Sequence, residues 1–191
     1  MIAGRRGIDN VSCSLAEPVL LGLGANRRHP EVVLGSALAV LGQMTALRVL
    51  KVSRFHRSEP MGPVPQPWFV NAAALLSSSL PPRDLLERLL QVERWFGRNR
   101  AREVRWGPRD LDLDLLAYGD RLLVMPDLIL PHPGLHRRRF VLAPLADIVP
   151  HWRHPLLHKS IDRLLHEVDD DSAVLPLPTR AATLEPSSLE R

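Results

Sequence analysis

Three aspartates alternate with leucines in the segment Asp110-Leu111-Asp112-Leu113-Asp114-Leu115. Successive side chains of an extended strand point to opposite faces, so this pattern predicts three carboxylates on one face and the leucines in the core. Neighbouring carboxylates on one face are roughly 6.6 Å apart. Two of them can converge on one or two hard cations such as Mg²⁺. The alternative interpretation is an edge strand with a solvated acidic face.

Arginines gather just before these aspartates. A divalent metal beside guanidinium groups neutralises a triphosphate and orients it for displacement. The combination therefore favours a magnesium-dependent enzyme that transfers phosphate from ATP to a small alcohol. The clustered arginines are Arg94, Arg98, Arg100, Arg102, Arg105 and Arg109.

Two further motifs suggest other sites but are incomplete. Gly22-Leu23-Gly24 begins like a dinucleotide fingerprint, but Arg27 occupies the third glycine position, so we interpret Gly24 as a turn glycine. In His132-Pro133-Gly134-Leu135-His136 the two histidines have a spacing that would suit zinc on a helix. The proline and glycine between them favour a loop instead, and we expect no zinc site.

The composition is that of one folded domain. The chain has 191 residues, of which 45% are hydrophobic, and a formal net charge of +4, which favours anionic partners. Cys13 is the only cysteine, so no internal disulfide can form and a cytoplasmic location is expected. No apolar run is long enough to span a bilayer, so we expect no membrane partner.

Periodicity and turn residues predict how the elements follow one another. The proline-rich stretch 58–67 is expected to be a stiff loop. The order strand, helix, strand, strand, helix, strand predicts an α+β ferredoxin-like sandwich, an antiparallel sheet with helices packed on it. The predicted strands are 18–24, 47–55, 69–80 and 110–118, with a return strand at 121–125 that forms a hairpin with the last of them; the predicted helices are 30–44, 81–96, 140–148 and 161–168.

The ends of the chain differ from its body. Residues 1–17 are small, polar and charged without periodicity, and we expect a flexible extension there. Residues 18–170 are predicted to form a single catalytic domain. Residues 171–191 have few apolar anchors, and we expect a disordered tail.

The segment 105–116 strongly resembles the signature of 6-hydroxymethyl-7,8-dihydropterin pyrophosphokinases, enzymes of folate biosynthesis. Three more segments resemble that family in the same order: 22–26, the stretch 55–71 with its proline-rich loop, and 131–140. The resemblance runs from about residue 19 to residue 150. It implies transfer of pyrophosphate from ATP to the pterin hydroxymethyl group, with release of AMP, on a ferredoxin-like fold that binds two magnesium ions.

The resemblance also implies a role for individual residues. Phe69 and Phe140 match an aromatic pair that sandwiches the pterin, and Asn71 matches an amide that hydrogen-bonds its ring. Glu93 matches an acidic residue with a structural or nucleotide-supporting role. The full implied set is as follows: metal ligands Asp112 and Asp114; catalytic residues Arg98, Arg105, Arg109, Asp112 and Asp114; pterin-binding residues Ser58, Met61, Phe69, Asn71, Trp106 and Phe140; ATP-binding residues Arg98, Arg109, Leu115, His132 and Arg138.

We expect a monomer whose partners are ATP and the pterin. The resemblance places Arg105 and Trp106 in a mobile loop that closes over the site. Two positions depart from the family pattern: Asp110 is an additional carboxylate, and Asp127 stands where a neutral or basic residue is expected.

Two other classes of protein use similar residues. A nucleotidyltransferase or two-metal nuclease also pairs aspartates with arginines, but it would have a glycine-serine loop where this chain has Gly107-Pro108. A nucleic-acid-binding module would use the arginines with Trp95, Phe96 and Trp106 as stacking platforms. That module would leave the aspartates facing phosphates without a purpose, so we expect no nucleic-acid partner.

Overall fold

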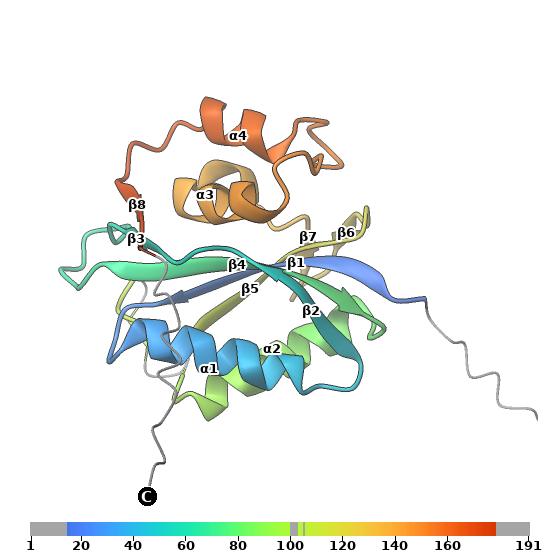
Figure 1. The fold of residues 1–191 in the computed structure, drawn as a ribbon, viewed down its shortest axis with the longest axis horizontal. Helices are drawn as coiled ribbons and strands as arrows, with labels where there is room; N and C mark the ends of the chain where they lie inside the picture. The colour runs from blue at the N-terminus through green and yellow to red at the C-terminus, as the bar shows by residue number, and fades with distance from the viewer. Residues whose placement is uncertain (1–14, 100–102, 105, 179–191) are drawn as a thin grey trace, which may run out of the picture.

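The computed structural model describes residues 15–99, 103–104 and 106–178. A central antiparallel sheet carries helices on both faces (Figure 1). The pair α1 and α2 covers one face, and α3 and α4 cover the other.

The centre of the sheet confirms the predicted ferredoxin-like arrangement. β1 pairs with β5 on one side and with β4 on the other, and β2 pairs with the free edge of β4. The order β5-β1-β4-β2 follows, with α1 and α2 as the crossovers. The bounds are β1 Glu17–Ala25, α1 Pro30–Gly42, β2 Leu47–Val52, β4 Phe69–Ser78, α2 Pro82–Trp95 and β5 Asp112–Tyr118.

Alternation along the strands divides the core in two. Odd-numbered residues of β1 pack on the α1 and α2 side, as do the apolar faces of both helices. A second cluster fills the space between the sheet and the layer of α3 (Arg139–Ile148) and α4 (Ile161–Glu167). Helices on the second face make this a three-layer molecule.

The second core covers only one end of its sheet face. In β1 it includes Leu20, in β4 Ala73 and in β5 Leu116. Further along each strand on the same face lie Gly24, Asn71 and the two strand aspartates, which α3 leaves uncovered and which line a pocket. We call this uncovered part the open end of the sheet.

Two short strands extend the sheet beyond the predicted ones. β3 (His56–Ser58) pairs with β4, and β8 (Val174–Pro176) pairs with β3. The prediction of a disordered tail from residue 171 is therefore wrong for 171–178, because backbone pairing with β3 orders a segment that has little apolar surface of its own. Residues 179–191 and 1–14 lie outside the described residues.

The predicted hairpin after β5 is also wrong. β6 (Leu123–Val124) pairs with β7 (Ile129–Leu130) in a separate two-stranded sheet. The reason lies at the outer edge of β5, where the backbone N–H of His132 donates to the Leu116 carbonyl at 2.8 Å. The chain therefore returns to β5 only after β7.

Candidate active site

A single pocket gathers most of the predicted site residues at the open end of the sheet. Its floor is formed by β1, β4 and β5, and its sides by the residues after β3, the segment 106–109 and the N-terminus of α3. The lining residues are Gly22, Leu23, Gly24, Ser58, Glu59, Met61, Phe69, Asn71, Ala72, Trp106, Gly107, Arg109, Asp112, Asp114, Arg138, Phe140 and Val141.

Gly24 gives the floor its depth. It lies inside β1 between Asn71 of β4 and Asp112 of β5, not in a turn, so that prediction is wrong. A Cβ at this position would be 3.0 Å from the Asn71 Oδ1 atom. The glycine therefore leaves room for the amide and carboxylate side chains on either side of it.

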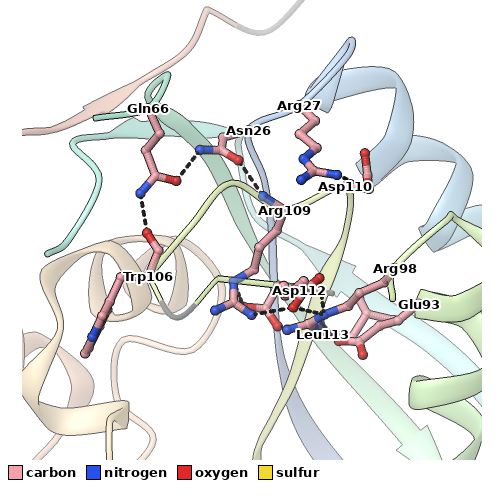
Figure 2. Close-up of polar contacts among 11 residues, drawn as sticks. Asn26, Arg27, Gln66, Glu93, Arg98, Trp106, Arg109, Asp110, Asp112 and Leu113 are labelled. Atoms are coloured by element: carbon pink, nitrogen blue, oxygen red, sulfur yellow. Dashed lines mark hydrogen bonds and ion pairs between the residues drawn. The ribbon is translucent and has the colours of Figure 1, made fainter. Parts of the chain in front are cut away.

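Asp112 and Asp114 line the pocket together, as the alternation predicts, while Leu111, Leu113 and Leu115 are buried in the core on the other face. Asp110 does not join them. It precedes β5, and its Oδ2 accepts a hydrogen bond from Arg27 Nη1 at 2.9 Å, away from the pair (Figure 2). The prediction of three carboxylates on one face therefore holds for two.

The carboxylate pair has the electrostatics of a cation site. Burial and the neighbouring charge of Asp112 raise the pKa of Asp114 to about 7, although Arg138 and Arg98 oppose this shift. A divalent cation would relieve that repulsion. Among the described residues no group of three or more His, Cys, Asp or Glu side chains is arranged to hold a metal. Two carboxylates suit Mg²⁺, which commonly completes its shell with water and substrate phosphates.

Arg98 is buried behind this pair and bonded to three carboxylates. Its Nη1 donates to Glu93 and to Asp112, and its Nε donates to Glu103 Oε1 at 3.2 Å. Burial opposes its charge, but Asp112, Glu93 and Glu103 together raise its pKa. Figure 2 shows the guanidinium beside Asp112.

Glu93 anchors this network to the sheet. The residue is 1% exposed, and its Oε1 also accepts the backbone N–H of Leu113 at 2.8 Å. Glu93 therefore fixes both Arg98 and the strand segment between the two aspartates. A structural role is one of the two roles that the resemblance implies for it.

Arg109 reaches Asp112 from the opposite side. Its Nε lies 3.7 Å from Asp112 Oδ2, and its Nη1 lies 3.5 Å from Glu103 Oε2. Two arginines thus flank one carboxylate at the edge of the pocket (Figure 2).

Two amide side chains join the loops that surround the pocket. Asn26, at the end of β1, accepts from the Arg109 backbone N–H at 2.7 Å and donates to Gln66 Oε1 and the Pro67 carbonyl, both at 2.9 Å. Gln66 in turn donates to the Trp106 carbonyl. Figure 2 shows this chain of contacts from Trp106 to Arg109.

The remaining wall has aromatic and amide groups. Phe69 and Phe140 both line the pocket, and Asn71 Nδ2 donates to Ser58 Oγ at 2.8 Å. Trp106 lies against Gly62, whose φ of 86° favours glycine. A Cβ added to Gly62 would be 3.0 Å from the Trp106 side chain, so this close approach also requires glycine.

Arg138 and His132 lie near the N-terminus of α3. The Arg138 guanidinium carbon is 5.8 Å from the centre of the Phe140 ring. Burial, followed by the charge of Arg138, lowers the pKa of His132, although Asp112 opposes this shift. The Gly134 backbone N–H donates to His132 Nδ1 at 3.0 Å. A neutral His132 ring therefore carries its proton on Nε2 and presents a donor there.

Ten of the predicted site residues line the pocket: Ser58, Met61, Phe69, Asn71, Trp106, Arg109, Asp112, Asp114, Arg138 and Phe140. Arg98 contacts the pocket through Asp112, and His132 is outside the lining. The Leu115 side chain is in the core on the opposite face. Arg105, like Arg100 and Arg102, lies outside the described residues.

The lining residues that we did not predict are Gly22, Leu23, Gly24, Glu59, Ala72, Gly107 and Val141. Apart from Glu59, these are small or apolar residues, which carry no chemical signal in a sequence. The period-two alternation of β1 could have placed Gly22 and Gly24 on the face of Asp112 and Asp114.

No helix in the described part of the chain is long and apolar enough to cross a membrane.

Comparison with known proteins identifies one family. The family model for 7,8-dihydro-6-hydroxymethylpterin-pyrophosphokinase matches residues 20–150. A 2-amino-4-hydroxy-6-hydroxymethyldihydropteridine pyrophosphokinase of Synechocystis is 41% identical over 172 residues, which cover 89% of this chain and 87% of that protein. The protein of the same name from Bacillus subtilis is 44% identical over 128 residues, covering 67% of this chain and 75% of the relative.

Solved structures agree on the fold. The crystal structure of Plasmodium falciparum HPPK-DHPS A437G with SDX-DHP superposes with a TM-score of 0.66 at 14% identity. The match covers 82% of this chain and 46% of the larger one, so this chain corresponds to less than half of that protein.

Proposed function

The chain belongs to the 7,8-dihydro-6-hydroxymethylpterin-pyrophosphokinase family, and from this membership we propose how its residues divide the work of the reaction. The protein transfers pyrophosphate from ATP to hydroxymethyldihydropterin in folate synthesis. ATP is the co-substrate. The observation that carries the proposal is the joining, in one pocket, of a carboxylate pair with an aromatic and amide wall.

Asp112 and Asp114 would hold magnesium, and we propose two ions. When bound, the metal would neutralise phosphate charge and lower the pKa of the attacking hydroxyl. Arg109 and Arg138 would contact the triphosphate from two sides of the pocket, because both line it and both carry a fixed positive charge. His132, with its proton on Nε2, would donate to the nucleotide.

Arg98 acts through Asp112 in this arrangement. Its guanidinium is enclosed by Glu93, Glu103 and Asp112. Because Glu93 and Glu103 hold the guanidinium in place, its bond to Asp112 would fix the orientation of that carboxylate. We therefore propose that the main role of Arg98 is to orient Asp112, a proposed metal ligand, and not to contact phosphate. The predicted catalytic role of Arg105, and much of the loop closure predicted around it, concern residues outside those described.

The pterin would occupy the side of the pocket between Phe69 and Phe140. A flat heterocycle is held well by ring faces above and below and by amide partners at its edge. Asn71 would offer its amide there, and the hydrogen bond from its Nδ2 to Ser58 Oγ fixes the orientation of that amide. Met61 and Trp106 would close the outer side.

The test is to incubate the protein with ATP, Mg²⁺ and hydroxymethyldihydropterin and to separate the nucleotide products. AMP should form in proportion to the pterin diphosphate and only when the pterin is present. Formation of ADP, or release of AMP independent of pterin, would contradict the proposal.

We further propose a monomer in the cytoplasm that contacts neither nucleic acid nor membrane. The single cysteine and the small-molecule nature of both substrates support this proposal.

A further inference from the structure

A segment after α4 is hydrogen-bonded to the two segments that form opposite sides of the pocket. Residues 169–176, which we call the C-terminal strap, run from the end of α4 to the end of β8. Figure 1 shows this part of the chain passing from the α3 and α4 layer to the edge of the sheet at β3. The strap lines no part of the pocket.

At its first end the strap holds the N-terminus of α3. Asp170 Oδ2 accepts the backbone N–H of Arg139 at 2.7 Å, and the Asp170 carbonyl accepts from Arg139 Nε at 2.7 Å. Arg138, the residue before the helix, makes no capping bond of its own. A carboxylate at this position satisfies an otherwise unpaired N–H and interacts favourably with the helix dipole.

Asp170 is itself held in place. Its Oδ1 accepts the Ser172 backbone N–H at 3.0 Å and also the Ser172 hydroxyl. Burial alone would raise the pKa of Asp170, but the hydrogen bonds from Ser172 and from the Arg139 N–H outweigh burial and lower this pKa. The carboxylate is therefore ionised and oriented at neutral pH.

At its second end the strap holds the other wall. The Glu59 backbone N–H donates to the Ala173 carbonyl at 3.2 Å, and the Ala173 N–H donates to Glu59 Oε2 at 3.0 Å. β8 then pairs with all three residues of β3, with Val174 opposite Ser58. β3 has only three residues and therefore few hydrogen bonds to β4, so its pairing with β8 contributes much of its order.

The two anchored segments carry the groups on either side of the pocket. The α3 end carries Arg138 and Phe140, and the β3 end carries Ser58 and Glu59. Ser58 in turn accepts from Asn71. The placement of Phe140 and of Ser58, which binds the Asn71 amide, thus depends on a segment that lines no part of the pocket.

From this geometry we propose that the C-terminal strap sets the width of the pterin half of the pocket, and that Asp170 is a positioning residue for pterin binding. The inference rests on the proposed function, since it assigns the pterin to the side between Phe69 and Phe140. The carboxylate pair and Arg109 belong to β5 and to the segment before it, whereas Arg138, the other proposed triphosphate contact, belongs to the α3 end that the strap holds. ATP binding should therefore depend on the strap less than pterin binding does.

The experiment compares Asp170→Ala with Asp171→Ala in the full chain. Asp171 is the matched control, because it is exposed, lies next to Asp170 in the same strap and makes no hydrogen bond or ion pair with any residue described. For each variant we would measure the KM for pterin, the KM for ATP and kcat, and the binding of pterin by its own fluorescence in the presence of a non-hydrolysable ATP analogue.

Asp170→Ala should raise the pterin KM and Kd about three- to tenfold, the loss expected for one charge-assisted helix cap. The KM for ATP should rise less than the pterin KM, because Arg138 is the one proposed triphosphate contact on the strap-held end of α3. The kcat should stay within about twofold of the wild-type value, and Asp171→Ala should behave as wild type. Asp170→Asn keeps an acceptor oxygen but loses the charge, so it should fall between the two.

A pterin KM equal to that of the control would overturn the proposal, as would parallel losses in all three parameters. Amide exchange provides a second measurement that needs no turnover. In Asp170→Ala, exchange should accelerate at the N-terminus of α3 and in β3 but not in β5. If wild-type protein consumes no pterin while this exchange pattern appears, the proposed function fails and the strap's structural coupling stands. Unchanged amide exchange at both the N-terminus of α3 and β3 would show that Asp170 does not couple these two segments.

Discussion

At the scale of single residues, the three aspartates differ in what surrounds them. Asp112 and Asp114 face the pocket, whereas Asp110 pairs with Arg27 before the strand begins. The alternation of β5 predicted the first two correctly, because burial of the leucines fixes the face. It could not show that the strand begins at Asp112. Asp110 lies before the strand, so its side chain need not follow the alternation of β5.

Asp112→Asn and Asp114→Asn should each reduce kcat/KM on the order of a hundredfold to ten-thousandfold, because each removes a charged side chain that we propose as a metal ligand. Asp110→Asn should cost less than about fivefold, since it breaks only an exposed ion pair. Magnesium titrations of activity for the three variants measure the difference. Equally severe loss at Asp110 would make it a ligand, and mild loss at the other two would contradict the assignment of the metal site.

Asp114 also makes a prediction about stability. Its folded pKa of about 7 lies above the ordinary 3.8. A raised carboxyl pKa gives a contribution to stability that is complete below the unfolded pKa and is lost as the pH rises through the folded pKa. Without metal, Asp114→Asn should therefore melt at a higher temperature than wild type at pH 8.5, and the difference should shrink at pH 5.

Thermal melts in a chelator, at several values of pH, check this expectation. Saturating Mg²⁺ with an ATP analogue should reverse the order of the two proteins, because only the wild type gains ligand stabilisation through the carboxylate. An Asp114→Asn variant that is less stable than wild type throughout, or whose advantage does not depend on pH, would contradict the buried-charge account.

At the scale of elements, long periodic segments were predictable and short paired ones were not. β1, α1, β4 and α2 follow patterns of hydrophobicity that fix their type. β3 and β8 have three residues each and no pattern, because their order comes from pairing with each other and with β4. The strand predicted at 121–125 is present as β6, but its predicted pairing with β5 is wrong, because the chain around His132 takes that edge instead.

The buried contacts of Arg98 show the same limit within the site. Its three carboxylate partners come from α2, from the segment before Trp106 and from β5. A sequence shows the arginine and the acids separately, but which acids enclose it depends on tertiary packing. The residue types in the pocket were therefore predictable, whereas the enclosure of Arg98 by three carboxylates was not.

Truncation tests the role of β8 as an element. A chain that ends at residue 172 loses the pairing with β3 and the packing of Leu177 on the core. We expect it to lose roughly 1–2 kcal/mol of stability, or about 2–8 °C in Tm. A chain that ends at residue 178 keeps β8 and is the control. Equal melting temperatures for the two truncations would show that β8 contributes nothing to the fold.

At the scale of the whole molecule, the sheet has a covered end and an open end on the same face. α3 and α4 cover one end, and the pocket occupies the other. The large apolar side chains that remain exposed in the described residues are spread over several elements, including Val32, Trp95, Val124 and Leu156. Single exposed apolar residues are ordinary on a protein surface and mark no interface.

Light scattering after gel filtration should accordingly give a mass near the 21.4 kDa of one chain. The measurement should be repeated with ATP analogue and pterin bound, and over a tenfold range of concentration. A mass of twice this value that persists on dilution would indicate a dimer and would require an apolar interface that the scattered exposed residues do not suggest.

The pairing of β8 with β3 has a consequence for the timing of synthesis. Ser58 leaves the ribosome long before Val174, its partner across the two strands, has been made. All residues of β1, β4 and β5, with the two aspartates, are synthesised before Val174, so the outer strand of the sheet is the last to become available. A nascent chain arrested before residue 174 should thus bind pterin less well than the released chain, because β3 still lacks its outer partner.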